Sequence, residues 1–215
     1  MANKVTLTAS DGSTVEFYDE IKAQGGVKDV YFSTDKTYVV AFYRKNLSPA
    51  EKDRLSNIVG PYHKRIFESP EGNYWKEYLI MPTKMVKWNE KTGVVLPFYP
   101  KRFFFSGGPF DGKEKEGKWF ASAKLRNRFL PADQKGTWLS NVHMCLKIAR
   151  AVRRLHAAGL AHSDLSYKNV LVDPISGNAC IIDADELVVP GKYDAGVLGT
   201  PDFSAPEVMA TRELK

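Results

Sequence analysis

The sequence predicts an α+β fold in which a β-rich first half is followed by a second half built around one long helix. Residues 5–18 alternate apolar and polar side chains around an Asp-Gly dipeptide, which is the pattern of an antiparallel hairpin with a tight turn. Between residues 139 and 156, apolar side chains recur at helical spacing until Gly159, as in an amphipathic helix with a C-terminal cap. The apolar runs 170–172 and 180–182 then predict two short strands.

Length and composition limit the class of protein. The chain has 215 residues, of which 43% are hydrophobic, enough for one domain or for two lobes that share a cleft. Cys145 and Cys180 lie in apolar runs without Cys-x-x-Cys spacing, so neither a disulfide framework nor a zinc site is predicted. No apolar run is long enough to span a bilayer, and we expect a soluble, cytoplasmic protein. The net charge of +6 is spread along the chain, so we expect neither a nucleic-acid nor a membrane partner.

The rest of the first half predicts more strands and one helix. Four apolar runs bounded by turn residues predict strands: 30–32, 38–42, 78–81 and 94–98. A turn-prone stretch at 89–93 would join the last two. Residues 48–51, Ser-Pro-Ala-Glu, combine an N-cap, a first-position proline and a capping-box glutamate, and so predict a helix start. Gly60-Pro61 should end or kink that helix.

A polar segment interrupts the second half. Residues 106–136 contain several glycines, a Lys-Glu-Lys-Glu run and a basic helical patch, and we interpret them as an insertion whose charges face solvent. The chain then divides into residues 1–98, an N-terminal lobe with the hairpin, an antiparallel sheet and one helix, and residues 99–215, a C-terminal lobe that carries the insertion.

The segment 162–169, His-Ser-Asp-Leu-Ser-Tyr-Lys-Asn, resembles the protein-kinase catalytic loop H-R-D-L-x-x-x-N. In that loop a carboxylate meets the incoming hydroxyl, while an amide oxygen five residues later meets a metal ion. The resemblance implies that Asp164 orients and deprotonates the nucleophile and that Asn169 binds Mg²⁺. His162 would brace the loop rather than act as a base.

Two further motifs follow in kinase order. Asp183-Ala184-Asp185 comes directly after an apolar strand, where kinases place D-F-G. Asp183 would then bind the Mg²⁺ that bridges the phosphates, and Asp185, in place of the glycine, adds a second carboxylate that could bind metal. Residues 199–207, Gly-Thr-Pro-Asp-Phe-Ser-Ala-Pro-Glu, are similar to the end of a kinase activation segment. The three motifs together resemble the eukaryotic-like protein kinase family of serine/threonine type, and imply a bilobal kinase fold.

The phosphate-binding elements of such a fold are less complete. Gly25-Gly26 stands where the phosphate-covering loop belongs, without the full G-x-G-x-x-G, and a plain turn between strands is the alternative. Ala41 would lie by the nucleotide, but Tyr43 replaces the lysine of V-A-x-K. Arg44 or Lys45 would then contact the α/β-phosphates. Strand alternation places Lys45 on the face of Ala41 and Arg44 on the other, and does not decide between them.

The hinge of the kinase fold would lie at 94–99. On the resemblance, Leu96 is the gatekeeper, and the Pro97 carbonyl and the Tyr99 N–H face adenine. The runs 160–164 and 188–192 also resemble bacterial kinases found beside tellurite-resistance genes.

The leading hypothesis is an ATP- and Mg²⁺-dependent protein kinase that phosphorylates a serine or threonine hydroxyl of a protein substrate. A small-molecule kinase of the aminoglycoside or choline type shares the His-x-Asp, Asn and Asp-x-Asp groups, but generally lacks the motif at 199–207. A third alternative is a nucleotide-binding pseudokinase scaffold, which the missing lysine and the reduced glycine loop would explain.

Two departures bear on these alternatives. Ser166 stands where serine/threonine kinases usually carry a lysine, which weakens the inference of a protein hydroxyl as acceptor. The resemblance also implies several helices beyond Glu207, whereas the sequence ends eight residues later. We therefore expect a helical C-terminal lobe that is truncated after the activation segment, either as a fragment or as a reduced lobe.

Overall fold

A strand-rich unit and a helix-rich unit make up the computed structural model, which describes residues 2–193, 199–204 and 206. The strand-rich unit comprises Met1–Arg65 and Met81–Phe98, and the helix-rich unit comprises Ile66–Ile80 and Tyr99–Lys215. The predicted α+β class is confirmed. Residues 66–80 group with the helix-rich unit because Ile80 N–H donates to the Ile181 carbonyl (2.9 Å), and Ile181 N–H to the Tyr78 carbonyl (2.9 Å).

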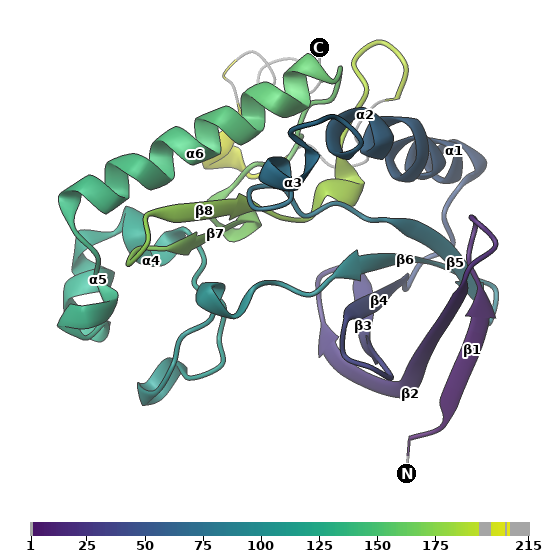
Figure 1. The fold of residues 1–215 in the computed structure, drawn as a ribbon, viewed down its shortest axis with the longest axis horizontal. Coiled ribbons are helices and arrows are strands. Elements are labelled where there is room, and N and C mark those ends of the chain that lie inside the picture. Colours follow the sequence, from purple (N-terminus) through teal and green to yellow (C-terminus); the bar gives the residue numbers. More distant parts are fainter. Residues whose placement is uncertain (1, 194–198, 205, 207–215) are drawn as a thin grey trace. The chain divides into compact units, whose positions relative to one another are not determined.

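The strand-rich unit is one antiparallel sheet of six strands (Figure 1). In chain order these are β1 (Lys4–Thr8), β2 (Thr14–Gln24), β3 (Lys28–Ser33), β4 (Tyr38–Tyr43), β5 (Lys84–Trp88) and β6 (Lys91–Pro97). Their order in the sheet is β1-β2-β3-β4-β6-β5. The hairpin predicted at residues 5–18 is confirmed as the β1–β2 pair, with Val5 opposite Phe17 and Leu7 opposite Val15.

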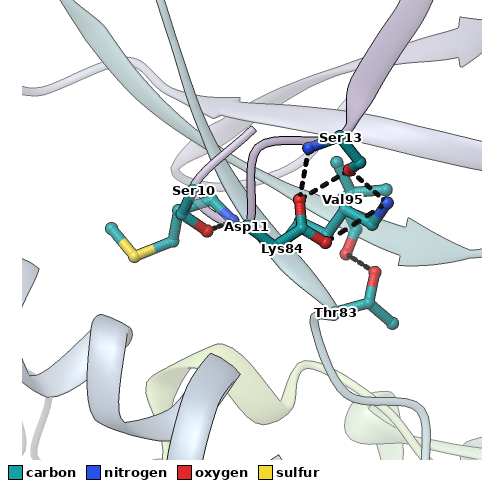
Figure 2. Close-up of polar contacts among 7 residues, drawn as sticks. Ser10, Asp11, Ser13, Thr83, Lys84 and Val95 are labelled. Carbon is teal, nitrogen blue, oxygen red and sulfur yellow. Dashed lines mark hydrogen bonds and ion pairs between the residues drawn. The ribbon is translucent and has the colours of Figure 1, made fainter. Parts of the chain in front are cut away.

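The turn between β1 and β2 is bonded to β5, the strand at the other edge of the sheet (Figure 2). Ser10 N–H donates to the Met85 carbonyl (2.8 Å), and Met85 N–H donates back to Ser10 Oγ (3.1 Å). Beside them, Lys84 Nζ donates to Ser13 Oγ (2.5 Å) and lies 3.5 Å from Asp11 Oδ2. These bonds connect the two outer strands of the sheet.

One face of this sheet carries an aromatic core. The rings of Phe17, Tyr31, Phe42 and Trp88 pack edge-on or tilted, with centroids between 5.2 and 5.7 Å apart. Such geometries add to the free energy gained by burying the rings. The aromatic alternation along the strands therefore fixes which face of each strand is internal.

The predicted helix start at residue 48 is confirmed in α1 (Pro49–Asn57). Glu51 N–H donates to Ser48 Oγ (3.2 Å), and Ser48 N–H donates to Glu51 Oε2 (2.7 Å), which completes the capping box. Gly60-Pro61 does not end the helical segment. It lies in a π-helical turn, η1 (Ile58–Tyr62), which is followed by α2 (His63–Phe67). A proline has no N–H to donate, and a wider turn accommodates it.

The prediction of a strand at residues 78–81 is wrong. After α3 (Gly72–Trp75) these residues form only an isolated bridge, between Leu79 and Ile181. The strand that forms a hairpin with β6 is β5, and the turn between them is Asn89-Glu90, both with positive φ. The run 78–81 is apolar because it is largely buried, not because it pairs in the sheet.

The helix-rich unit is built around α6 (Trp138–Ala157), and its prediction is confirmed. The helix starts at a capping box between Thr137 and Ser140. The predicted hairpin β7 (Val170–Asp173) and β8 (Asn178–Ile181) is also present, and its side chains pack with Met144 of the helix. The predicted insertion contains α4 (Lys118–Ala121) and α5 (Ala123–Phe129). Short 3-10 turns complete the unit: η2 (Lys101–Phe103), η3 (Gly108–Phe110), η4 (Ala132–Gln134), η5 (Tyr167–Asn169), η6 (Ala184–Glu186) and η7 (Pro201–Phe203).

Candidate active site

The loop before β7 folds on itself and brings Asp164 to Asn169. The Asn169 side-chain nitrogen donates to the Asp164 carbonyl (2.6 Å) and to its Oδ2 (3.3 Å). Ser166 sets the turn: its N–H donates to the Asp164 carbonyl (2.9 Å), and its own carbonyl accepts from Asn169 N–H (3.0 Å). Because the amide nitrogen of Asn169 is turned to Asp164, its amide oxygen is the atom that could bind a cation.

His162 connects this loop to the strand end that precedes Asp183. Its Nδ1 accepts from Asp164 N–H (3.3 Å), and its Nε2 lies 3.2 Å from the Ile182 carbonyl. A ring that accepts at Nδ1 and donates at Nε2 is neutral. Burial lowers the pKa of His162 below its usual value of 6.5, which favours the same neutral form. The imidazole is thus placed to hold two backbone segments together.

Asp183 stands just after β8 in a left-handed backbone conformation, with φ 60° and ψ 36°. Residues other than glycine seldom adopt this conformation, and such backbone strain is concentrated at functional sites. Ile182 N–H donates to the Asn169 carbonyl (3.0 Å), so the segment carrying Asp183 is bonded to the segment carrying Asn169. Asp183 is half-buried, whereas Asp185 in η6 is completely buried.

These side chains offer hard oxygen donors for a divalent cation. Asn169 and Asp183 combine an amide oxygen with a carboxylate, both donors of the kind that suits Mg²⁺. Within the described part of the chain, no group of three or more His, Cys, Asp or Glu side chains is placed to hold a metal ion. A magnesium site here would therefore depend on the amide of Asn169 and on oxygen atoms from a bound phosphate or water.

Residues 199–204 contact the loop that contains Asp164. Thr200 Oγ1 donates to Asp164 Oδ1 (2.7 Å). Gly199, with φ 71°, lies so close to the loop that a Cβ there would be 2.6 Å from the Ser163 carbonyl oxygen. The ring of Phe203 packs edge-on against that of Tyr167 at 5.0 Å. The motif at 199–207 predicted this region, but not the Thr200 bond to Asp164; of that motif, residues 205 and 207 lie outside the described residues.

The predicted insertion is attached to the same loop. Gly117 N–H lies 2.9 Å from the Tyr167 carbonyl and 2.8 Å from that of Val170, and Glu116 bridges to Leu171 of β7. A Cβ at Gly117 would come within 3.2 Å of the Tyr167 carbonyl oxygen. This contact could not be predicted from the sequence, because a polar, glycine-containing segment is also typical of a solvated loop.

In the strand-rich unit, Gly25-Gly26 forms the turn between β2 and β3. The Arg44 guanidinium donates to both carbonyls of this dipeptide. The other predicted base, Lys45, bonds Glu51 at 2.8 Å, and its side chain is 63% exposed. Each of the two candidates therefore has a structural partner within the unit.

The other residues predicted to lie by the nucleotide are on β4 and β6 or just after β6. Ala41 and Leu96 are both buried, and the register places Ala41 opposite Val94 and Val39 opposite Leu96. Pro97 ends β6, and Tyr99 is the first residue after Phe98 at the boundary between the units. The hinge roles of these residues stay predictions.

Among the residues that the structure describes, none belongs to a helix long and apolar enough to cross a bilayer.

Several known kinases are similar to this chain. The model of the lipopolysaccharide kinase (Kdo/WaaP) family matches residues 134–187. The dual serine/threonine and tyrosine protein kinase of Apis mellifera is 32% identical over 146 residues, which cover 61% of this chain and 15% of that protein. The dual specificity testis-specific protein kinase 1 of Homo sapiens is 31% identical over 91 residues, covering 38% and 14%.

Among solved structures, vaccinia related kinase 3 is similar with a TM-score of 0.54 and 16% sequence identity, over 93% of this chain and 59% of that chain. The chain therefore has the α+β fold of protein kinases. It spans only a small part of the two curated relatives, 15% and 14% of their lengths.

Proposed function

We propose that this chain is an ATP- and Mg²⁺-dependent phosphotransferase that transfers the γ-phosphate to a hydroxyl group. The observation that supports it most is the bonding of Asp164, which accepts hydrogen bonds from Asn169 in the same loop and from Thr200 in the segment 199–204. A carboxylate held in this way has a fixed direction, as positioning of an acceptor hydroxyl requires.

In this proposal Asp164 orients the acceptor hydroxyl and takes its proton, and His162 positions the loop. Asn169 and Asp183 hold Mg²⁺, which when bound neutralises charge on the phosphates. Asp183 suits this role better than Asp185, because Asp185 is completely buried while Asp183 is partly exposed at a strand end. The left-handed backbone of Asp183 agrees with a position selected for function rather than for stability.

A serine or threonine of a protein is the acceptor that we propose first. Its support is the contact between Thr200, in the activation-segment motif, and Asp164. The curated relatives named above are protein kinases, which agrees with it. The second candidate is a sugar or other small-molecule hydroxyl, because the family model that matches residues 134–187 is that of lipopolysaccharide kinases.

The narrower resemblance to kinases encoded beside tellurite-resistance genes stays a prediction, supported by the runs 160–164 and 188–192 alone.

The test is transfer of ³²P from γ-labelled ATP, with Mg²⁺, to three acceptors in parallel: a serine/threonine-rich protein, lipopolysaccharide and water. We expect labelled protein, lost in Asp164→Asn and in Asp183→Asn but kept in the control Asp19→Asn, which alters an exposed carboxylate of β2. Labelled lipopolysaccharide alone would establish the second candidate. Binding of Mg²⁺-ATP without transfer to any acceptor would instead identify a pseudokinase scaffold and contradict the proposal.

A further inference from the structure

The strand-rich unit has a tyrosine where a kinase fold carries its phosphate-binding lysine, and the two basic residues that follow have other partners. Tyr43 is buried at the end of β4. Arg44 donates to the carbonyls of the Gly25-Gly26 turn, and Lys45 is paired with Glu51 and mostly exposed. Another strand carries a further candidate for the charge that contacts the α/β-phosphates.

The register of the sheet identifies a candidate on β3. Lys28 lies directly opposite Tyr43, and Val30 directly opposite Ala41. Opposed residues of an antiparallel pair project from the same face, so Lys28 lies on the face of Ala41 and Tyr43. The aromatic core, with Phe42, occupies the other face.

The side chain of Lys28 follows this placement. Its Nζ lies 5.5 Å from the centroid of the Tyr43 ring, within the range of a cation–π contact, and the residue is half-buried. The ammonium group of Lys28 thus lies beside the residue that stands in the place of the strand lysine.

The backbone around Lys28 is fixed by the same turn. The Lys28 carbonyl accepts from Gly25 N–H (2.9 Å), and Arg44 N–H donates to the Val27 carbonyl (3.0 Å). Lys28 is the first residue of β3 and follows the loop that contains the two glycines. On the resemblance to kinases, this loop stands where the phosphate-covering loop belongs. A turn with two glycines lets a ligand approach the backbone closely.

We propose that Lys28 supplies the phosphate-binding ammonium group of the strand-rich unit, in place of the missing strand lysine, and contacts the α- and β-phosphates of ATP. This inference rests on the proposed function, because it assumes that ATP is the ligand. An ammonium group is a compact charge with three donors and suits phosphate oxygens that are not held in a planar fork.

The experiment compares the affinity for Mg²⁺-ATP with that for adenosine, which has no phosphates, by calorimetry. In Lys28→Met we expect about a 10- to 100-fold weaker binding of Mg²⁺-ATP, the usual effect of losing a charged hydrogen bond, with adenosine affinity unchanged. Lys87→Met is the matched control, because Lys87 is an exposed lysine of β5 that pairs with Glu90. It should bind both ligands as the unaltered protein does.

A relocation of the charge tests the geometry itself. Because residues 28 and 43 are opposed, the double variant Lys28→Met, Tyr43→Lys should regain most of the Mg²⁺-ATP affinity lost in Lys28→Met. A conservative variant, Lys28→Arg, keeps the charge and should retain more affinity than Lys28→Met, even if the double variant proves unstable.

The outcomes separate the two proposals. If the unaltered protein binds Mg²⁺-ATP and Lys28→Met binds it equally well, Lys28 is not the phosphate ligand, while the phosphotransferase proposal stands. If Lys28→Met loses adenosine and Mg²⁺-ATP alike, its role is structural and the inference is also wrong. If the unaltered protein binds no Mg²⁺-ATP, both proposals fail.

Discussion

Thr200 Oγ1 donates a 2.7 Å hydrogen bond to Asp164 Oδ1, so the segment 199–204 fixes one oxygen of the proposed catalytic carboxylate. The other oxygen, Oδ2, accepts from the Asn169 side chain at 3.3 Å. Thr200, 36 positions from Asp164 along the chain, and Asn169, five positions from it, thus determine the direction of the Asp164 carboxylate.

Removal of the Thr200 hydroxyl should slow phosphate transfer. For Thr200→Val we expect kcat to fall about 10-fold or more, with the KM for Mg²⁺-ATP little changed, because the lost bond orients Asp164 and does not hold the nucleotide. Thr200→Ser restores a hydroxyl and should keep most of the activity. Steady-state kinetics of the three proteins decide, and an unchanged kcat in Thr200→Val would show that the bond has no part in transfer.

A methyl group at Gly199 should disturb the same contact. Gly199→Ala places a Cβ 2.6 Å from the Ser163 carbonyl oxygen, in addition to the strain of φ 71°. Gly191→Ala is the matched control: Gly191 has φ 76°, but its Cβ would meet no atom within 4 Å. We expect each alanine to cost about 1 kcal/mol of unfolding free energy from strain, and only Gly199→Ala to lower kcat. Equal activity of the two variants would contradict the close packing at Ser163.

The capping glutamate of α1 should make stability depend on pH in acid. Hydrogen bonds, first from Lys45 and then from the Ser48 backbone, lower the pKa of Glu51 from 4.5 to about 2. The folded state therefore favours the ionised carboxylate, and this stabilisation is complete above pH 4.5 and is lost as the pH falls towards 2.

Glu51→Gln should accordingly unfold more easily at pH 7, by about 1 kcal/mol for a partly exposed group. The difference from the unaltered protein should disappear as the pH falls towards 2. Urea unfolding at several pH values measures it, with exposed Glu20→Gln as the reference substitution. A difference that stays constant with pH would mean that the charge of Glu51 does not matter.

His162 should be a neutral imidazole with its proton on Nε2 at pH 6.5. Burial lowers its pKa, so the folded state binds a proton less readily than the unfolded chain does, and stability should decrease as the pH falls below 6.5. ¹⁵N NMR of the ring nitrogens, with the signal assigned by its loss in His162→Gln, reports tautomer and titration together. A signal that titrates above 6.5, or a proton on Nδ1, would contradict the bonds to Ile182 and Asp164.

Much of the helix-rich site could be predicted from the sequence, because its parts are local. Asp164 and Asn169 are five residues apart in one tight turn, and the resemblance to the kinase catalytic loop predicted that they lie on the same side of it. Asp183 follows directly after a short buried strand, which the apolar run 180–182 identified. Helix α6 could also be predicted, since its amphipathic period and its capping residues both indicate a helix.

Other features depend on contacts between distant residues, and the sequence did not predict them. The run 78–81 has the composition of a strand but is buried beside Ile181, while β5 carries two lysines, Lys84 and Lys87, and is less obviously a strand. The position of Lys28 relative to Tyr43 follows from the register of β3 and β4, which no local pattern determines.

The bonds between the β1–β2 turn and β5 have a consequence for how the strand-rich unit unfolds. Outer strands of a sheet usually fray first, and their backbone groups are then open to pairing with another chain. Here Ser10 and Met85 bond each other from opposite edges, so neither edge can detach without breaking contacts at the other. The sheet should therefore open in one cooperative step, and the amide protons of Ser10 and Met85 should exchange with solvent almost as slowly as those of β4.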